Sequence, residues 1–322
     1  MRNAWRVLLG VIALAVAASA GAQTKLKWAH VYEATEPYHT AALWAAGEIR
    51  KRTSGRYEIE VFPASTLGKE TDINQGLALG TVDIIYTGQP FAGRTYGPIA
   101  IGGAPYMFRD FDHWKRYSTS PLFAELCAGY QKAAGGNHVS AITYYGERHV
   151  TSNKAINKPE DMKGLKIRVP DAPLYTMFPR AVGANPTPIA FAEVYLALQN
   201  GTVDAQENPL PTIDAKKFYE VQKYIVLTGH ITDALFTIVS GQTWGKLSDE
   251  DKKTFDAVFK EAAARATGEI VEIEKKMAAE FEKRGKIVVK VDRKPFRDAT
   301  VKMHNGPDAT WPRDVYDKLQ AL

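Results

Sequence analysis

Two arginines and an asparagine are the residues of this chain best suited to bind an organic acid. Arg148 lies in YYGERHVTSN, Arg168 lies 20 residues later in KGLKIRVPDA, and Asn208 lies in DAQENP. A guanidinium holds a carboxylate through two parallel hydrogen bonds, and a neighbouring amide can fix the plane of the guanidinium. The three side chains predict a carboxylate clamp, although composition alone would also allow both arginines to face solvent on strands.

Catalytic and metal-binding motifs are missing from the sequence. It contains no G-x-S-x-G, no Walker loop, no H-E-x-x-H and no G-x-G-x-x-G after a strand. The seven histidines have no ligand-like spacing, and the single cysteine, Cys127, excludes an internal disulfide. We therefore expect a binding protein without metal or cofactor. A periplasmic enzyme that anchors an organic acid through the same arginines, or a purely structural protein, are the alternatives.

The first 22 residues have the pattern of a secretory signal peptide. Arg2 and Arg6 precede an apolar run from Val7, and small residues follow as A-S-A and A-G-A. No later segment has the roughly 18 apolar residues of a membrane span, and no cysteine near the cleavage region could carry a lipid. The sequence predicts export to the periplasm, with a mature chain that begins near Gln23.

Charge argues against a nucleic-acid partner. The formal net charge of +5 falls by two when Arg2 and Arg6 leave with the signal peptide. The remaining lysines and arginines are interleaved with acids, and no stripe of basic and aromatic residues stands out. We expect a monomer that binds a small molecule.

The N-terminal part of the chain alternates between strand and helix patterns. Strands are predicted at residues 25–31, 56–63 and 81–88, and helices at 37–55 and 69–80. This order predicts a parallel sheet covered by helices, in which ligands gather at the carboxyl ends of the strands. KGLKIRVP is a further strand, closed by Pro170, and it places Arg168 at such an end.

A short repeat indicates two similar lobes. LALGTVDIIYTGQP and ALQNGTVDAQENP share the sequence G-T-V-D after an apolar helix end, and the two copies lie 121 residues apart. Four residues beyond the aspartates Asp83 and Asp204, the chain reaches Thr87 and Asn208. Both are expected at the exit of a strand. The alternative is that G-T-V-D is merely a good helix stop and strand start.

Residues 248–285 contain no proline and predict one long helix that crosses both lobes. Ser248 with Asp251 three residues later forms a capping-box pattern, and Gly285 marks the end. The alternative is two helices interrupted near Thr267 and Gly268.

The central run TSNKAINKPEDMKGLKIRVPDAPLYTMFPRAVGANPTPIAFAEVYLALQNGTVDAQENP resembles the solute-binding proteins of tripartite ATP-independent periplasmic (TRAP) transporters, DctP type. The resemblance extends over nearly the whole mature chain. It implies an α/β, two-lobed periplasmic binding protein fold (Venus flytrap) with the long helix spanning both lobes. The implied lobes are residues 24–145 plus 234–273 and residues 146–233 plus 274–322. It also implies that the receptor delivers its ligand to a pair of TRAP membrane subunits.

The resemblance also assigns residues to the ligand site. Arg168 matches the carboxylate-binding arginine of the family, Asn208 the asparagine that accompanies it, and Arg148 the second arginine of a G-x-R motif. Phe191, in AFAEVY, matches an aromatic residue that lines the site, and Glu70 matches an acidic position of the first lobe that often contacts the ligand.

The remaining candidates of the first lobe bear on the identity of the ligand. His30, Glu70, Thr87 and Gln89 are hydrogen-bonding groups suited to hydroxyls, and Glu70 would repel a second carboxylate. Gly88 stands where sialic-acid-binding members of the family carry a glutamate. These residues favour a hydroxylated monoacid such as a uronate or an aldonate. A C4-dicarboxylate or an aromatic 2-oxo acid is the alternative ligand.

Overall fold

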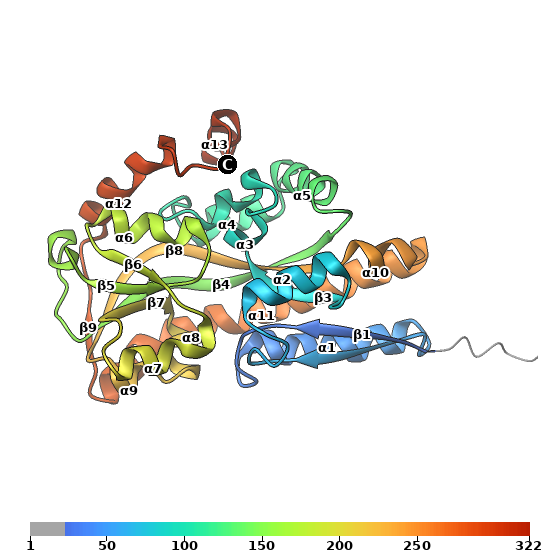
Figure 1. The fold of residues 1–322 in the computed structure, drawn as a ribbon, viewed down its shortest axis with the longest axis horizontal. Helices are drawn as coiled ribbons and strands as arrows, with labels where there is room; N and C mark the ends of the chain where they lie inside the picture. The colour runs from blue at the N-terminus through green and yellow to red at the C-terminus, as the bar shows by residue number, and fades with distance from the viewer. Residues whose placement is uncertain (1–22) are drawn as a thin grey trace, which may run out of the picture.

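The structure, a computed structural model, describes residues 23–322; the predicted signal peptide, residues 1–22, lies outside the described residues. Within residues 23–322, nine strands form one mixed sheet in the order β2-β1-β3-β8-β4-β7-β5-β6, with β9 paired to β8 (Figure 1). The strands are β1 (Thr24–Ala29), β2 (Tyr57–Phe62), β3 (Ile84–Gly88), β4 (His138–Ser152), β5 (Lys166–Val169), β6 (Asn185–Pro188), β7 (Ala205–Pro209), β8 (Tyr224–Val239) and β9 (Ile287–Val289).

Helices cover the sheet and connect its parallel strands. The α-helices are α1 (Pro37–Arg52), α2 (Glu70–Leu79), α3 (Gln89–Ala92), α4 (Phe111–Ser118), α5 (Pro121–Ala133), α6 (Met177–Ala181), α7 (Val194–Gln199), α8 (Leu210–Ala215), α9 (Phe218–Val221), α10 (Gly241–Lys246), α11 (Asp249–Lys283), α12 (Arg293–Val301) and α13 (Arg313–Gln320). The 3-10 helices are η1 (Gly97–Gly103), η2 (Pro159–Met162), η3 (Pro173–Thr176), η4 (Phe191–Glu193) and η5 (Lys302–Asn305). None of the helices in residues 23–322 combines the length and the hydropathy needed to span a bilayer.

The two ends of the sheet repeat one arrangement. At one end β1 pairs in parallel with β2 and β3, and at the other β5 pairs in parallel with β6 and β7. We call the β2-β1-β3 end with its helices the first lobe, and the β7-β5-β6 end with its helices the second lobe. The predicted two-lobed α/β fold is therefore confirmed, and the five predicted N-terminal elements appear as β1, α1, β2, α2 and β3. The residue boundaries given for the lobes stay a prediction.

The G-T-V-D repeat has the same structural role in both lobes. The Asp83 carboxylate accepts a hydrogen bond from the backbone N–H of Lys27 in β1, at 2.8 Å. The Asp204 carboxylate accepts one from the N–H of Lys166 in β5, at 2.9 Å. Each aspartate ties its own strand to the parallel neighbour, and each glycine of the repeat adopts the left-handed conformation, with φ of 73° and 72°.

As a result, Thr87 and Asn208 occupy the same place, the fourth residue of β3 and of β7. Both side chains are buried near the point where their strand ends.

Three elements join the lobes. Strands β4 and β8 run antiparallel to each other between the two ends of the sheet, and α11 packs on α1 of the first lobe and on α8 and β9 of the second (Figure 1). Helix α11 is continuous over 35 residues, so the predicted single long helix is confirmed and there is no break at Thr267 and Gly268. It begins where the Ser248 hydroxyl accepts a hydrogen bond from the Asp251 N–H at 3.1 Å.

Candidate functional site

Arg168 lies at the third position of β5 and is 2% exposed. Its Nε and Nη2 donate to the backbone carbonyl of Ile189 at 3.0 and 2.7 Å, which fixes the plane of the guanidinium. Its Nη1 is buried and has no hydrogen-bond partner among residues 23–322, and no carboxylate of these residues lies within ion-pair distance. Burial lowers the pKa of Arg168 to about 10, because little compensates its charge. A buried cation with an unused donor is suited to hold an anion.

Two small cavities between the lobes meet at Arg168. Each measures about 20 Å³, which is room for about one water molecule. They share Glu70 of α2 and Phe191 of η4, together with Arg168 and Pro170. The first is also lined by Val31, Tyr32, Tyr145, Arg148, Tyr175, Asn208 and Leu235, and the second by Lys69, Thr71, Phe91, Asp171, Ile189 and Ala190.

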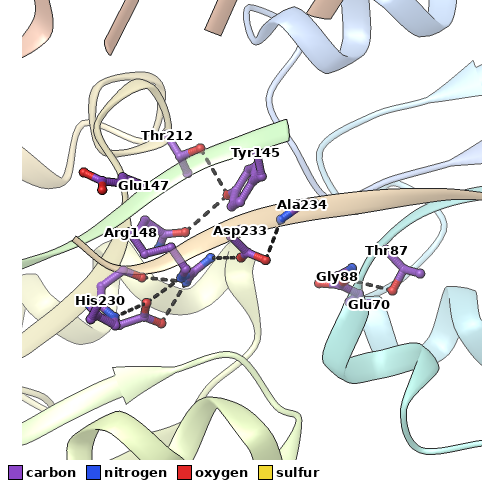
Figure 2. Close-up of polar contacts among 12 residues, drawn as sticks. Glu70, Thr87, Gly88, Tyr145, Glu147, Arg148, Thr212, His230, Asp233 and Ala234 are labelled. Atoms are coloured by element: carbon purple, nitrogen blue, oxygen red, sulfur yellow. Dashed lines mark hydrogen bonds and ion pairs between the residues drawn. The ribbon is translucent and has the colours of Figure 1, made fainter. Parts of the chain in front are cut away.

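Arg148 lines the same cavity, but its charge is already compensated. Its Nε and Nη2 bind the carboxylate of Glu207 at 2.5 and 2.8 Å, and its Nη1 binds Asp233 at 3.0 Å (Figure 2). Glu207 also contacts His230, at 3.1 Å. Although burial opposes ionisation, Arg148 and His230 lower the pKa of Glu207 to about 2. Burial raises the pKa of Asp233 to about 6 in spite of Arg148. Arg148 therefore serves an internal ion-pair cluster.

Asn208 lines the cavity, but its contacts differ from those expected. Its Nδ2 donates to Gln206 at 2.6 Å, and its Oδ1 accepts from the hydroxyl of Tyr145 at 3.2 Å. The prediction that this amide fixes the plane of Arg168 is therefore wrong for this conformation, since the carbonyl of Ile189 does so. A backbone carbonyl leaves no trace in a sequence motif.

Glu70 is the acidic residue of the first lobe that reaches both cavities. Its Oε1 accepts from the hydroxyl of Thr87 at 2.9 Å and from the N–H of Gly88 at 2.8 Å (Figure 2). Burial raises the pKa of Glu70 to about 7, against the effect of these hydrogen bonds. Thr87 is thus a support for Glu70 and lines neither cavity.

His30 and Gln89 also lie outside both cavities, contrary to their predicted role. His30 is 1% exposed and contacts His39 at 3.1 Å, and burial lowers its pKa to about 3. Gln89 is fully buried beside Gly102. A Cβ added to Gly102 would lie 2.4 Å from the Oε1 of Gln89. Counting to the end of a strand locates a residue along the chain but does not say which face of the sheet its side chain takes.

The tyrosines of the site were missed by sequence reasoning. Tyr32, Tyr145 and Tyr175 line the cavity of Arg168, and each is at most 4% exposed. The ring of Tyr32 lies 5.3 Å from that of Tyr145 and 6.1 Å from that of Phe191. Tyr32 lies three residues after the end of β1 and Tyr175 lies in η3, just beyond β5. The position of Tyr32 and Tyr175 just after strands that pair in parallel could have identified them as candidate site residues from the sequence.

The lobes are held together on both sides of these cavities. Arg94 of the first lobe donates to the backbone and side chain of Asp171 in the second, at 2.5 and 3.2 Å. Lys216 binds Glu33 at 2.6 Å across the lobes. Nearby, the hydroxyl of Thr212 donates to Glu36 at 2.7 Å. The cavities hold about one water molecule each, so an organic acid could enter only if these contacts opened.

A larger hollow, of about 790 Å³, lies elsewhere, between α4, α5, β4 and α11. Its walls are mostly apolar, and its charged neighbours are Lys115, Lys260 and the pair of His138 with Asp256. It contains no arginine, whereas the guanidinium of Arg168, with its unpartnered Nη1, lies at the two small cavities. Residues 23–322 also hold no cluster of three or more side chains suited to a metal ion.

Residues 28–306 match the family described as bacterial extracellular solute-binding protein, family 7 (DctP), and the chain belongs to this family. The sialic acid-binding periplasmic protein SiaP of Vibrio cholerae is 33% identical over 322 residues, which cover 100% of both chains.

Solved TRAP periplasmic solute-binding proteins share the fold. One from Polaromonas, bound to D-erythronate, is 33% identical, with a TM-score of 0.88 over 93% of this chain and 99% of that one. Another, from Pseudomonas putida with bound D-glucuronate, is 25% identical, with a TM-score of 0.88 over 93% of this chain and 97% of that one. The chain is thus a solute-binding receptor of the TRAP type and not an enzyme.

Proposed function

We propose that this receptor captures a hydroxylated monocarboxylic acid, a uronate or an aldonate, and that Arg168 binds its carboxylate. The observation that carries the proposal is the unpartnered Nη1 of a guanidinium that is 2% exposed. A carboxylate at Nη1 would supply both the missing hydrogen bond and the missing counter-charge. The guanidinium carbon of Arg168 lies 5.8 Å from the ring centroid of Phe191. This aromatic ring would exclude water from the ion pair.

The hydroxyls of the acid have partners in the same cavity. Glu70 is a strong acceptor that uses Oε1 for its contacts with Thr87 and Gly88. Tyr32 and Tyr175 line the cavity, and either could supply a hydroxyl to the ligand. These groups suit a polyol chain, because hydroxyls can donate to Glu70 or accept from it. The charged form of Glu70, whose pKa burial raises to about 7, would disfavour a second carboxylate. The bound D-erythronate and D-glucuronate of the two solved relatives support this class of ligand.

We also propose the cellular context that the family implies. The receptor is exported to the periplasm by residues 1–22 and acts there as a monomer. It passes its ligand to the small and large membrane subunits of a TRAP transporter. Closure would bring together a lobe of residues 24–145 plus 234–273 and a lobe of residues 146–233 plus 274–322.

A thermal-shift screen followed by calorimetry tests the ligand class. The panel contains hexuronates, aldonates, C4-dicarboxylates, aromatic 2-oxo acids and sialic acid. A ligand at about 1,000 times its dissociation constant should stabilise the fold by roughly 4 kcal/mol. Stabilisation by uronates or aldonates supports the proposal. In the Arg168→Ala variant, this stabilisation by ligand should disappear. A response confined to dicarboxylates, oxo acids or sialic acid would reject the ligand class, and an unchanged response in Arg168→Ala would reject the role of Arg168.

A further inference from the structure

The hollow of about 790 Å³ between α4, α5, β4 and α11 is separate from the candidate site at Arg168. None of the residues that line it lines either of the two small cavities. Its volume lies in the range of about 300–1,000 Å³ that is usual for sites of small organic molecules. A ligand in this hollow would therefore leave Arg168 free to hold another.

The walls of the hollow are mostly apolar and are built in part from small side chains. Helices α5 and α11 both pack on β4, and both line the hollow. At helical spacings of three and four residues, α5 presents Ala124, Cys127 and Ala128, and α11 presents Ala263, Ala264 and Thr267. The larger apolar residues of the walls are Trp114, Phe123, Val139 and Ile142. An apolar molecule would find contact surface on both helices.

The charges available at the hollow are mainly positive. Lys115 of α4 and Lys260 of α11 line it, and neither forms an ion pair with another of residues 23–322. Among the described residues, the only carboxylate in the walls is that of Asp256, which contacts His138 at 2.9 Å. The charge of Lys260 acts within the hollow, because it opposes the effect of burial, which raises the pKa of Cys127 to about 12. These charges favour an anion over a cation.

A buried hydroxyl in the wall has no partner. Ser140 is the extra residue of a β-bulge, because the pairing of β4 with β8 shifts between Val139 and Ala141. Ser140 lines the hollow, is 3% exposed, and its Oγ forms no hydrogen bond within residues 23–322. Buried polar groups are nearly always hydrogen-bonded, so a polar atom of a ligand at this wall would satisfy the hydroxyl.

We propose that this hollow is a second ligand site, and that it takes an amphipathic anion with an apolar chain or ring, such as a medium-chain fatty acid. The apolar part would lie between α5 and α11, and the acidic group would lie towards Lys260, with Lys115 as a second positive charge. A sugar acid suits these walls poorly, because its hydroxyls would lose water against apolar side chains. The proposal is independent of the ligand at Arg168, because the two sites share no residue.

A fluorescent aromatic anion, 8-anilinonaphthalene-1-sulfonate, is the probe for this site. Titration of the folded mature protein should give saturable binding with a rise in emission. Decanoate should displace the probe, whereas decyltrimethylammonium, which has the same chain and the opposite charge, should displace it less well. A saturating uronate or aldonate should leave the probe bound. The absence of saturable binding, or equal displacement by the two amphiphiles, would overturn the proposal.

Filling the hollow tests where the probe binds. Ala128→Trp places a large ring in the hollow from α5, so affinity for the probe should fall by about tenfold or more. Ala133→Trp is the matched control, since Ala133 is exposed on the same helix but does not line the hollow. If Ala128→Trp lowers the melting temperature, Ala264→Trp fills the hollow from α11 instead. Unchanged affinity in the filled variants, or an equal loss in the control, would place the probe elsewhere and overturn the proposal.

Reversing a charge tests the role of the lysines. Lys260→Glu replaces an attraction by a repulsion, so affinity for the probe and for decanoate should fall by about fivefold. Lys253→Glu is the control, since Lys253 is exposed on the same helix outside the hollow. Equal effects of the two substitutions would remove Lys260 from the site. Neither substitution should change binding of a sugar acid, so failure of this proposal and failure of the proposed function are separate results.

Discussion

Arg148 and Arg168 are equally buried, line one cavity and differ in their electrostatic surroundings. Each is 2% exposed. Arg148 meets the carboxylates of Glu207 and Asp233, whereas Arg168 meets one backbone carbonyl and keeps Nη1 free among residues 23–322. A buried charge costs several kcal/mol unless it is paired, so the same residue type serves two purposes. The first arginine holds the second lobe together, and the second is poised for an anion from outside the chain.

The largest expected effect separates the arginines by the stability of the free protein. Arg148→Met leaves Glu207 and Asp233 buried without a counter-charge, so the free energy of unfolding should fall by about 3–5 kcal/mol. Arg168→Met removes a charge that has no carboxylate partner, so it should not lower the free energy of unfolding. Urea denaturation of both free variants measures the difference. Equal losses in the two variants would contradict the contrast drawn here.

The next effect concerns binding. Arg168→Ala should weaken binding of the acid by about 2–5 kcal/mol, because the carboxylate of the ligand loses a desolvated partner. Arg168→Lys should also lose affinity, since it keeps the charge but lacks the planar fork. Isothermal calorimetry against the best ligand of the screen measures both. Wild-type affinity in either variant would remove Arg168 from the site.

A pH dependence should come from the cluster of Arg148. Burial raises the pKa of Asp233 from 3.8 to about 6, so the folded state holds its proton more tightly than the unfolded state. This stability is present below pH 4 and is lost as the pH rises through 6, by about 3 kcal/mol at most. Asp233→Asn should reduce the slope of the free energy of unfolding between pH 4 and 7 by this share. The shares of Glu36, Glu70 and Glu274, whose pKa values burial also raises to about 7, should remain. An unchanged slope in Asp233→Asn would show that Asp233 contributes nothing to it.

Asn208 should give the smallest change. Asn208→Ala leaves the hydroxyl of Tyr145 and the amide of Gln206 with one partner fewer, which should cost about 1 kcal/mol in stability or affinity. Its effect on binding should stay below that of Arg168→Ala in the same calorimetric assay. A greater loss than that of Arg168→Ala would show that the amide, and not the guanidinium, is the principal anchor.

The sequence predicted the parallel part of the fold well because its signals are local. The G-T-V-D repeat, the strand and helix periods and the cap of Ser248 each depend on a few neighbouring residues. The long strands β4 and β8 were harder, since both are buried along nearly their whole length and do not alternate between polar and apolar faces.

The sequence predicted which segments of the chain carry the candidate site, but not which of their side chains reach the cavities. Arg168, Glu70 and Phe191 reach the cavities, but His30 and Gln89 do not. Whether Arg148 is free or paired depends on Glu207 and Asp233, which lie 59 and 85 residues away in sequence. Such distant partners are set by the packing of the whole sheet and not by a motif.

The connections between the lobes also bear on how readily proteases can cleave the chain. Where β4, β8 and α11 pass from one lobe to the other, each connection is a regular strand or helix. Proteases cut extended, mobile segments that fit their active sites, and none of these three connections is an irregular segment. We therefore expect the lobes to move against each other through bending of the shared strands and helix, and we expect these three connections to resist cleavage.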